Sequence, residues 1–183
     1  WKLREEVVNR LLKVNDYLIS KSSFYLLICD SWRPLEVQEF MFKRAFLLEC
    51  KKSDINASFE NRKSHPSILN KVEKFWAYPS YDSSCPPPHS TGAALDVCLS
   101  DKEGNLVEMG SLVDQMDETS NPDFYENIED EEAIIWNGRR KLLREIMTKF
   151  GFVQHPNEWW HFSYGDQLWA WKNKKANAIY GKI

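Results

Sequence analysis

The sequence has no block of basic residues, no CxxC pair of cysteines and no apolar run that approaches the length of a membrane span. Its 24 Lys and Arg are outnumbered by 27 Asp and Glu, so the net charge of −3 predicts no nucleic-acid partner. The four cysteines lack metal-ligand spacing, and Cys29 and Cys98 lie in apolar runs typical of reduced core residues. These absences exclude a disulfide scaffold and favour a domain built on its own hydrophobic core.

The length predicts one domain over residues 1–183, because a chain of this size can bury a core without disulfide bonds. No signal peptide is visible, which predicts a cytoplasmic protein. The chain begins at Trp1 rather than Met, so removal of an N-terminal segment, and with it a periplasmic location, is the alternative. The sequence carries no signal for an oligomeric state.

Apolar residues at helical spacing predict four helices, and shorter apolar runs predict strands. Helices are expected over residues 5–19, from Pro34 to Lys51, from a Ser64 cap to an end before Tyr78, and over 130–150. Strands are expected at 24–29, at 95–99 and within 152–164. The second and last helices are inferred partly from Val37, Phe40, Leu47, Leu48, Ile134 and Ile135.

Two stretches carry most of the functional information. Residues 89–96, His-Ser-Thr-Gly-Ala-Ala-Leu-Asp, place an imidazole and a carboxylate seven residues apart, and Glu-Trp-Trp-His at 158–161 supplies another pair. Two histidines and one aspartate are a standard set for a catalytic zinc that keeps its fourth position open for water. A glutamate that does not bind the metal is what such a site needs as a general base.

Asp96 stands inside an apolar strand, where a carboxylate is costly to bury without a partner. A metal ion is one such partner and a buried hydrogen bond is the other. Glu158 and His161 would face opposite sides of an ideal strand, so both reach one metal only if the chain bends near Glu158. Pro156 and Asn157 make such a bend plausible.

Two further side chains have both an ordinary and a functional interpretation. Arg33 lies where a predicted strand ends and a helix begins, so it is either a surface arginine paired with a carboxylate or a clamp on a developing oxyanion. Asp114 lies in an acidic, irregular stretch at 110–128, so it is either one of several solvated acids or a partner for a substrate ammonium group.

Four motifs in order resemble those of the D-alanyl-D-alanine dipeptidases, the zinc enzymes of the VanX type. They are Asp-Ser-Trp-Arg-Pro at 30–34, His-Ser-x-Gly-x-Ala-x-Asp at 89–96, Met-Gly-Ser-x-x-Asp at 109–114 and Gly-Phe-x5-Glu-Trp-Trp-His at 151–161. The resemblance extends from about Trp1 to Tyr164. One such motif would be weak, whereas four with matching order and spacing are specific.

The resemblance implies an α+β fold, shared by D-Ala-D-Ala peptidases and hedgehog-like proteins, with a zinc site on a small antiparallel sheet. It implies zinc-dependent hydrolysis of D-alanyl-D-alanine or a closely related dipeptide, with a role in cell-wall peptidoglycan. In this sequence the zinc ligands would be His89, Asp96 and His161. Glu158 would be the catalytic base, Arg33 would stabilise the transition state, and Asp114 would hold the amino group of the dipeptide.

Two departures bear on substrate choice. The family has a serine two residues before the first zinc histidine, where it helps to bind the substrate carboxylate, and this chain has Pro87. The family also has an N-terminal segment with a substrate-contacting tyrosine, and this chain starts after it. Recognition of the carboxylate, and the stereochemistry of the substrate, therefore stay open.

Two alternative functions follow from the same residues. A related zinc carboxypeptidase or endopeptidase on cell-wall peptides would not need Asp114, because longer substrates have no ammonium group there. A non-catalytic module would keep zinc for structure but would need neither Glu158 nor Arg33, and it usually fills the fourth position with protein. His155 is the one obvious candidate for such a fourth ligand, while His65, at a predicted helix start, is expected to be solvated.

Overall fold

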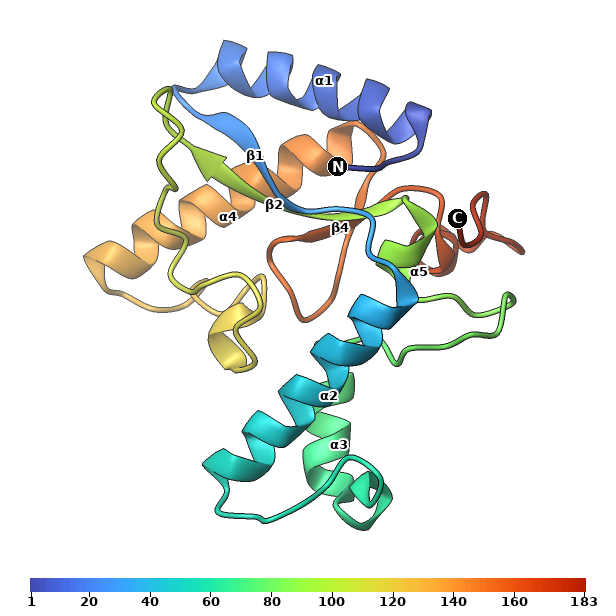
Figure 1. Ribbon diagram of the computed structural model, residues 1–183. Helices are drawn as coiled ribbons and strands as arrows, with labels where there is room; N and C mark the ends of the chain where they lie inside the picture. The colour runs from blue at the N-terminus through green and yellow to red at the C-terminus, as the bar shows by residue number, and fades with distance from the viewer.

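A four-stranded antiparallel sheet in the order β1–β2–β4–β3 organises the computed structural model, which describes residues 1–183 (Figure 1). The strands are β1 (Tyr25–Asp30), β2 (Ala94–Ser100), β3 (Val153–Gln154) and β4 (His161–Ser163). The helices are α1 (Glu5–Lys21), α2 (Leu35–Lys52), α3 (Pro66–Glu73), α4 (Glu131–Lys149) and α5 (Gln167–Lys172). Three 3-10 helices are η1 (Arg62–Ser64), η2 (Pro88–Thr91) and η3 (Glu118–Ser120). The expected α+β fold with a small antiparallel sheet is confirmed.

The larger hydrophobic core lies between the sheet and helices α1 and α4. Successive side chains of a strand point to opposite faces, so Leu95, Val97 and Leu99 of β2 enter this core together. Val7 and Leu143 are among the buried residues that α1 and α4 contribute. Asp96, between the apolar positions, faces the other side of the sheet and lines a pocket there.

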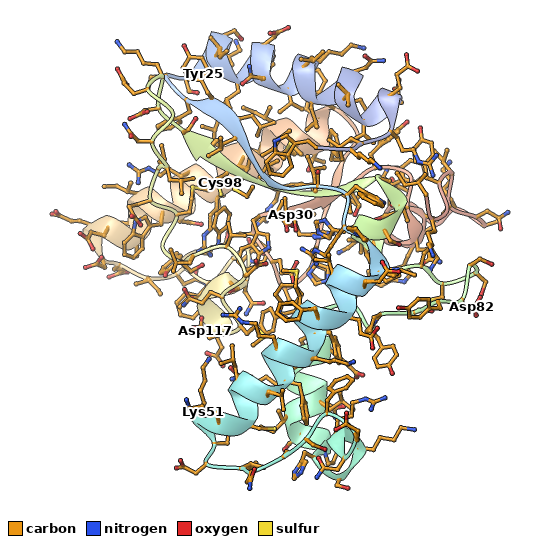
Figure 2. The ribbon with its side chains drawn as sticks, in the orientation of Figure 1. Tyr25, Asp30, Lys51, Asp82, Cys98 and Asp117 are labelled. Atoms are coloured by element: carbon orange, nitrogen blue, oxygen red, sulfur yellow. The ribbon has the colours of Figure 1, made fainter.

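Helices α2 and α3 form a hairpin that extends away from the sheet, as Figure 1 shows. Its members pack on each other in a second, separate hydrophobic cluster that includes Phe42, Phe46 and Val72. Asp30 lies where β1 passes into α2, and Lys51 lies near the far end of that helix (Figure 2). The pocket under Asp96 lies where this hairpin meets the sheet, because residues of both line it.

The elements expected from the sequence are present, with three corrections. Ser64 does not cap α3: it ends η1, and His65 occupies the cap position without a side-chain hydrogen bond. The short helix α5 was not expected from the sequence. The apolar residues Val37, Phe40, Leu47, Leu48, Ile134 and Ile135 lie in helices as predicted, but they are exposed rather than buried. None of the helices combines the length and the apolar character that crossing a bilayer requires.

Candidate metal centre

His89 is delivered to the site by η2, which follows Pro86 and Pro87. Within this turn the Ser90 hydroxyl donates to the Pro87 carbonyl at 2.7 Å, and Gly92 ends the turn in the left-handed conformation at φ +67°. A left-handed residue is easily supplied by glycine, so the chain can leave η2 sharply and enter β2. His89 is therefore buried just before the start of β2, a central strand of the sheet.

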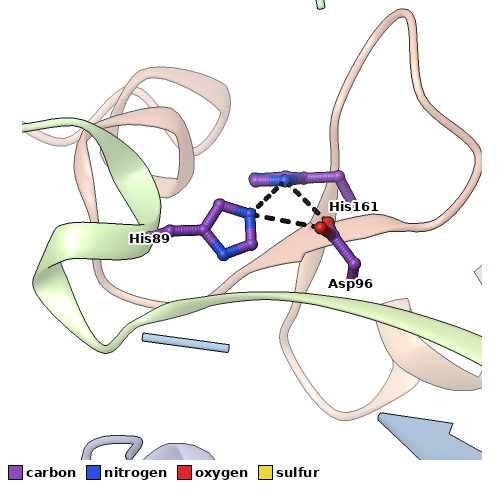
Figure 3. A group of neighbouring side chains, drawn as sticks. All are labelled: His89, Asp96 and His161. Atoms are coloured by element: carbon purple, nitrogen blue, oxygen red, sulfur yellow. Dashed lines mark hydrogen bonds and ion pairs between the residues drawn. The ribbon is translucent and has the colours of Figure 1, made fainter. Parts of the chain in front are cut away.

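Sheet register brings the other two predicted ligands together. Asp96 on β2 pairs directly with His161 on β4, so their side chains leave the same face of the sheet. The Nδ1 atom of His161 lies 3.1 Å from Asp96 Oδ1, and His89 Nε2 lies 3.5 Å from Asp96 Oδ2. Figure 3 shows the three side chains converging on one point. Their potential ligand atoms all lie within 4.8 Å of one another, and all three residues are buried.

Hydrogen bonds fix which ring nitrogen of each histidine is free. His89 Nδ1 donates to the Ser31 carbonyl at 2.7 Å, so Nε2 keeps its lone pair and points at the cluster. His161 Nε2 lies 3.5 Å from the Ser163 hydroxyl, which donates to Asp166 Oδ2 at 2.7 Å. This arrangement places the proton of His161 on Nε2 and leaves the Nδ1 lone pair facing Asp96.

The donor set fits a metal ion. The two unprotonated ring nitrogens lie 3.2 Å apart, with no hydrogen to share between them. Asp96 Oδ1 is buried without a hydrogen-bond partner, which is costly unless a cation occupies the space beside it. Two neutral imidazoles and one carboxylate are the ligand types that zinc prefers at sites with an open position.

The electrostatics of the cluster also favour positive charge. Burial alone would raise the pKa of Asp96, but the neighbouring His89 and His161 outweigh it and hold that pKa far below its usual range. Burial alone would lower the pKa of His89, but the Asp96 carboxylate outweighs it and raises that pKa. The centre therefore stabilises a cation in a water-poor environment.

Glu158 reaches the same centre because the chain bends before β4. The residues before His161 are not part of the strand, and Glu158 Oε2 lies 3.6 Å from His161 Nδ1. The chain bends near Glu158 as expected, with Pro156 and Asn157 in the bend. Burial, with the charges of Asp96 and Asp114 adding to it, raises the pKa of Glu158 well above its usual value. Its carboxyl group makes no hydrogen bond, so it is free to exchange a proton with a group in the pocket.

Arg33 is buried and held in place from two sides. Its Nε and Nη2 donate to Asp30 Oδ2 at 3.1 and 2.5 Å, and its Nη1 donates to Gln38 Oε1 at 2.7 Å. Gln38 in turn donates to the Ala77 carbonyl at 2.7 Å, and the Trp76 ring lies 5.2 Å from the guanidinium carbon. Arg33 is therefore paired with a carboxylate and also lines the pocket, so its two interpretations are compatible.

Asp114 lies on the irregular segment between β2 and α4 and faces the same pocket. Its backbone is left-handed at φ +64°, a conformation that aspartate and asparagine tolerate better than most residues. The side chain reaches solvent, yet the walls around it remove enough water to raise its pKa to about 6, with the Asp96 charge adding to this effect. Asp114 has no cationic partner in the protein.

Sequence reasoning missed several members of this pocket, namely Gln38, Phe75, Trp76, Ala77 and Trp160. Gln38 carried no readable signal, because its burial follows from the packing of α2 and not from the apolar pattern, in which the nearby Val37 and Phe40 are exposed. His155 also lines the pocket, with Nδ1 3.7 Å from Glu158 Oε2, but it is not in the His-Asp-His cluster. Burial and the neighbouring His161 lower the pKa of His155 to about 3, so it is neutral.

The pocket is small and partly open to solvent, and the centre of a water molecule has about 50 Å³ of space within it. Three carboxylates, those of Asp96, Asp114 and Glu158, face a single guanidinium, that of Arg33. When the histidines are neutral and the carboxylates are ionised, the lining carries a net charge of −2. A divalent cation balances that charge, so the pocket suits a metal ion together with a small polar ligand.

Comparisons with known proteins give a consistent family. The peptidase M15 family, described as D-ala-D-ala dipeptidase, matches residues 3–179. A D-alanyl-D-alanine dipeptidase of Synechocystis sp. is 37% identical over 99% of this chain and 76% of its own length. A protein of the same name from Enterococcus faecium is 31% identical over 88% of this chain and 72% of its own length.

Solved structures share the fold. A mutant of the vancomycin-resistance D,D-pentapeptidase VanY, solved in complex with Zn(II), superposes with a TM-score of 0.55 at 15% identity. The alignment covers 97% of this chain and 81% of VanY. A structure of VanYB in complex with D-alanine-D-alanine gives a TM-score of 0.56 at 15% identity, over 97% and 80% of the two chains.

Proposed function

The chain belongs to the D-alanyl-D-alanine dipeptidase family and is a peptidase, and on this basis we propose that it hydrolyses D-alanyl-D-alanine or a closely related small dipeptide with the help of zinc. One observation carries the proposal: a His-Asp-His cluster, a free buried glutamate, a clamped arginine and an unpaired aspartate line a single pocket. Each of these groups has a separate task in peptide hydrolysis.

His89, Asp96 and His161 would hold one zinc ion, and the two histidine lone pairs and the unpartnered Asp96 oxygen support this assignment. When bound, zinc polarises a peptide carbonyl and makes water acidic enough to lose a proton near neutral pH. The relative solved with Zn(II) supports the choice of metal. The Ser163–Asp166 pair would keep His161 in the tautomer that presents Nδ1.

Glu158 would be the general base. Its carboxylate accepts a proton from the attacking water and later delivers that proton to the nitrogen of the leaving amine. The absence of any hydrogen bond to its carboxyl group supports this role, as does its position 3.6 Å from His161. Burial in a water-poor pocket keeps the proton from escaping to solvent between the two steps.

Arg33 would stabilise the negative charge that develops on the carbonyl oxygen in the transition state. Asp30 and Gln38 fix its guanidinium before substrate arrives, so little reorganisation is needed at the moment of reaction. Asp114 would pair with the substrate's amino group across the pocket. Such a pair limits the enzyme to substrates whose amino terminus lies one residue from the scissile bond.

The amine-binding role distinguishes a dipeptidase from a related carboxypeptidase or endopeptidase. A longer substrate would place a neutral peptide group, not an ammonium ion, beside Asp114. Position 87 is proline, whose ring carries no hydroxyl, so the family's carboxylate-binding serine is missing at that position. The carboxylate end of the substrate is therefore bound by other groups than that serine.

A panel of free dipeptides tests the reaction. We expect D-alanyl-D-alanine to be hydrolysed faster than the L,D and L,L forms, and we expect a chelator to abolish turnover until zinc is restored. Release of alanine is the measurement. Turnover that survives complete removal of metal would reject the zinc mechanism, and a preference for longer cell-wall peptides would favour the endopeptidase alternative.

Metal content tests the ligands separately from turnover. The purified protein should bind about one zinc per chain, and alanine in place of His89, Asp96 or His161 should each remove it. His155→Ala is the matched control, because it removes an imidazole from the same pocket that is not in the ligand cluster. Metal analysis that finds zinc lost in the His155 variant would make His155 a fourth ligand and the site a structural one.

A further inference from the structure

Arg140 on α4 is almost completely buried, at 1% exposure, and none of its contacts is with a carboxylate. Its guanidinium donates only to the segment that carries Asp114. Nε donates to the Met109 carbonyl at 2.7 Å, and Nη1 donates to the Thr119 and Asn121 carbonyls at 2.8 and 2.9 Å. Nη2 donates to the Ser111 hydroxyl at 3.0 Å. One side chain therefore binds both ends of the segment 109–121.

The segment needs such support because little regular structure holds it. Its one element is the 3-10 helix η3, and two of its residues have left-handed backbones, Gly110 at φ +86° and Asp114 at φ +64°. A Cβ atom at Gly110 would lie 2.5 Å from the Tyr125 ring, so the chain passes there without room to move. Tyr125 also donates from its hydroxyl to the Gly110 carbonyl at 2.5 Å.

The same contacts connect the segment to Trp159. Ser111 Oγ, which accepts from Arg140, also accepts from Trp159 Nε1 at 2.9 Å. The Trp159 amide donates to the Ser120 carbonyl at 3.0 Å, and the Trp159 ring lies 5.2 Å from the guanidinium carbon of Arg140. Trp159 therefore bonds to the segment near both of its ends, at Ser111 and at Ser120, and supports the same shape as Arg140 does.

Burial of a cation without a counter-ion is unfavourable, so this guanidinium needs strong compensating contacts. Burial lowers the pKa of Arg140 to about 10, which leaves it charged at neutral pH. Carbonyl groups and the aromatic faces of Tyr125 and Trp159 surround it. A guanidinium carries five donors in a fixed plane and so reaches all of these acceptors at once, whereas a lysine ammonium cannot.

We propose that Arg140 is a positioning residue that holds the segment 109–121 in the shape that presents Asp114 to the substrate's amino group. The inference rests on the proposed amine-binding role of Asp114. Arg140 itself touches neither the substrate nor the metal ligands. Its loss therefore changes the recognition of the substrate's amino end and leaves metal binding intact.

The test is Arg140→Lys in the full-length, zinc-loaded protein, assayed on free and N-acetylated D-alanyl-D-alanine. Misplacement of Asp114 should lower kcat/KM for the free dipeptide by about fivefold to thirtyfold, no more than Asp114→Asn itself, and change kcat/KM for the acetylated dipeptide much less. Zinc content should stay at the native level. Adding Asp114→Asn to Arg140→Lys should lower the preference for the free amine no further than Asp114→Asn alone.

Arg144→Lys is the matched control. Arg144 lies one turn further along α4 and pairs at the surface with Asp123, so its substitution should leave both substrates unaffected. If Arg140→Lys does not fold, Ser111→Ala carries the same test, because it removes the hydroxyl that links Arg140 to Trp159. Ser111→Ala should also lower kcat/KM for the free dipeptide, by a smaller factor than Arg140→Lys.

The outcomes separate the two proposals. Equal rates for free and acetylated dipeptide in the native protein reject the amine-binding role of Asp114, and the inference about Arg140 with it. A native preference for the free amine that survives in both Arg140→Lys and Ser111→Ala rejects the inference alone. If kcat/KM falls by the same factor for the free and the acetylated dipeptide, and the melting temperature also falls, the inference about Arg140 is rejected. That result would show that Arg140 only stabilises the fold.

Discussion

Replacing Glu158 with alanine is expected to lower kcat for D-alanyl-D-alanine by a factor of about 10² to 10⁴, while the protein keeps its fold and its zinc. The reason is that only proton transfer is removed, since Glu158 is outside the His-Asp-His cluster and makes no hydrogen bond that holds the pocket together. The measurement is kcat under saturating substrate, together with zinc content and the melting temperature of the same preparation.

Glu158→Gln is the shape-matched companion, because it keeps the side chain's size and removes only its ability to accept a proton. Glu126→Gln, at an exposed site on the segment before α4, is the control and should behave as the native protein does. Loss of zinc from either Glu158 variant would make Glu158 a ligand and overturn the roles assigned here. Near-native turnover in Glu158→Gln would show that another group accepts the proton.

Asp114→Asn should lower kcat/KM for the free dipeptide by roughly fivefold to thirtyfold and narrow its advantage in kcat/KM over the N-acetylated dipeptide. An exposed ion pair contributes about 0–1 kcal/mol, whereas breaking a buried charge pair costs about 2–5 kcal/mol. Asp114 lies at the mouth of the pocket in a partly desolvated position, so we expect about 1–2 kcal/mol. Asparagine is the right replacement because it tolerates the left-handed backbone at this position.

Asp117→Asn is the control on the same segment. Asp117 accepts hydrogen bonds from the Thr119 amide and from Gln115, and it is not among the residues that line the pocket. Asparagine can still accept at that cap, so the variant should retain both the fold and the preference for the free amine. A native enzyme that hydrolyses both substrates at the same rate would reject the amine-binding role and favour the endopeptidase alternative.

The His-Asp-His cluster was predictable because its side chains come from short motifs with fixed spacing. His89 lies in the turn η2, and Asp96 lies in the strand β2 that follows this turn directly. His161 lies opposite Asp96 because β2 pairs with β4. The sequence also indicated the bend at Pro156, from the need to bring Glu158 and His161 to one side. Local sequence patterns were sufficient to predict the positions of side chains that are set by neighbouring residues in the chain.

The rest of the pocket was not predictable because it depends on contacts between distant segments. Gln38 matters only because the hairpin turns back to place the Ala77 carbonyl beside it. Arg140 reads as one more charged residue in a helix, and nothing local shows that it is surrounded by the carbonyls of Met109, Thr119 and Asn121. Tertiary packing determines the surroundings of both Gln38 and Arg140.

The prediction of which apolar helix residues are buried was wrong for a related reason. Spacing identifies a helix but does not identify which apolar side chains find a neighbour. The buried face of α2 consists of Leu35, Gln38, Phe42, Ala45, Phe46, Glu49 and Cys50, and it includes two polar residues. Glu49 is satisfied there by Lys52 and Lys71, a pairing with a residue of α3 that the sequence pattern alone does not reveal.

The separation of the two hydrophobic clusters divides the enzyme into parts that can change independently in evolution. The His-Asp-His cluster and Glu158 come from η2, the sheet and the bend before β4, whereas Gln38, Phe75 and Trp76 come from the hairpin and the residues that follow it. Mutations that repack α2 against α3 would reshape one wall of the pocket without changing a proposed metal ligand. Natural variation and laboratory libraries confined to the hairpin therefore offer a route to new peptide specificities on an unchanged hydrolytic centre.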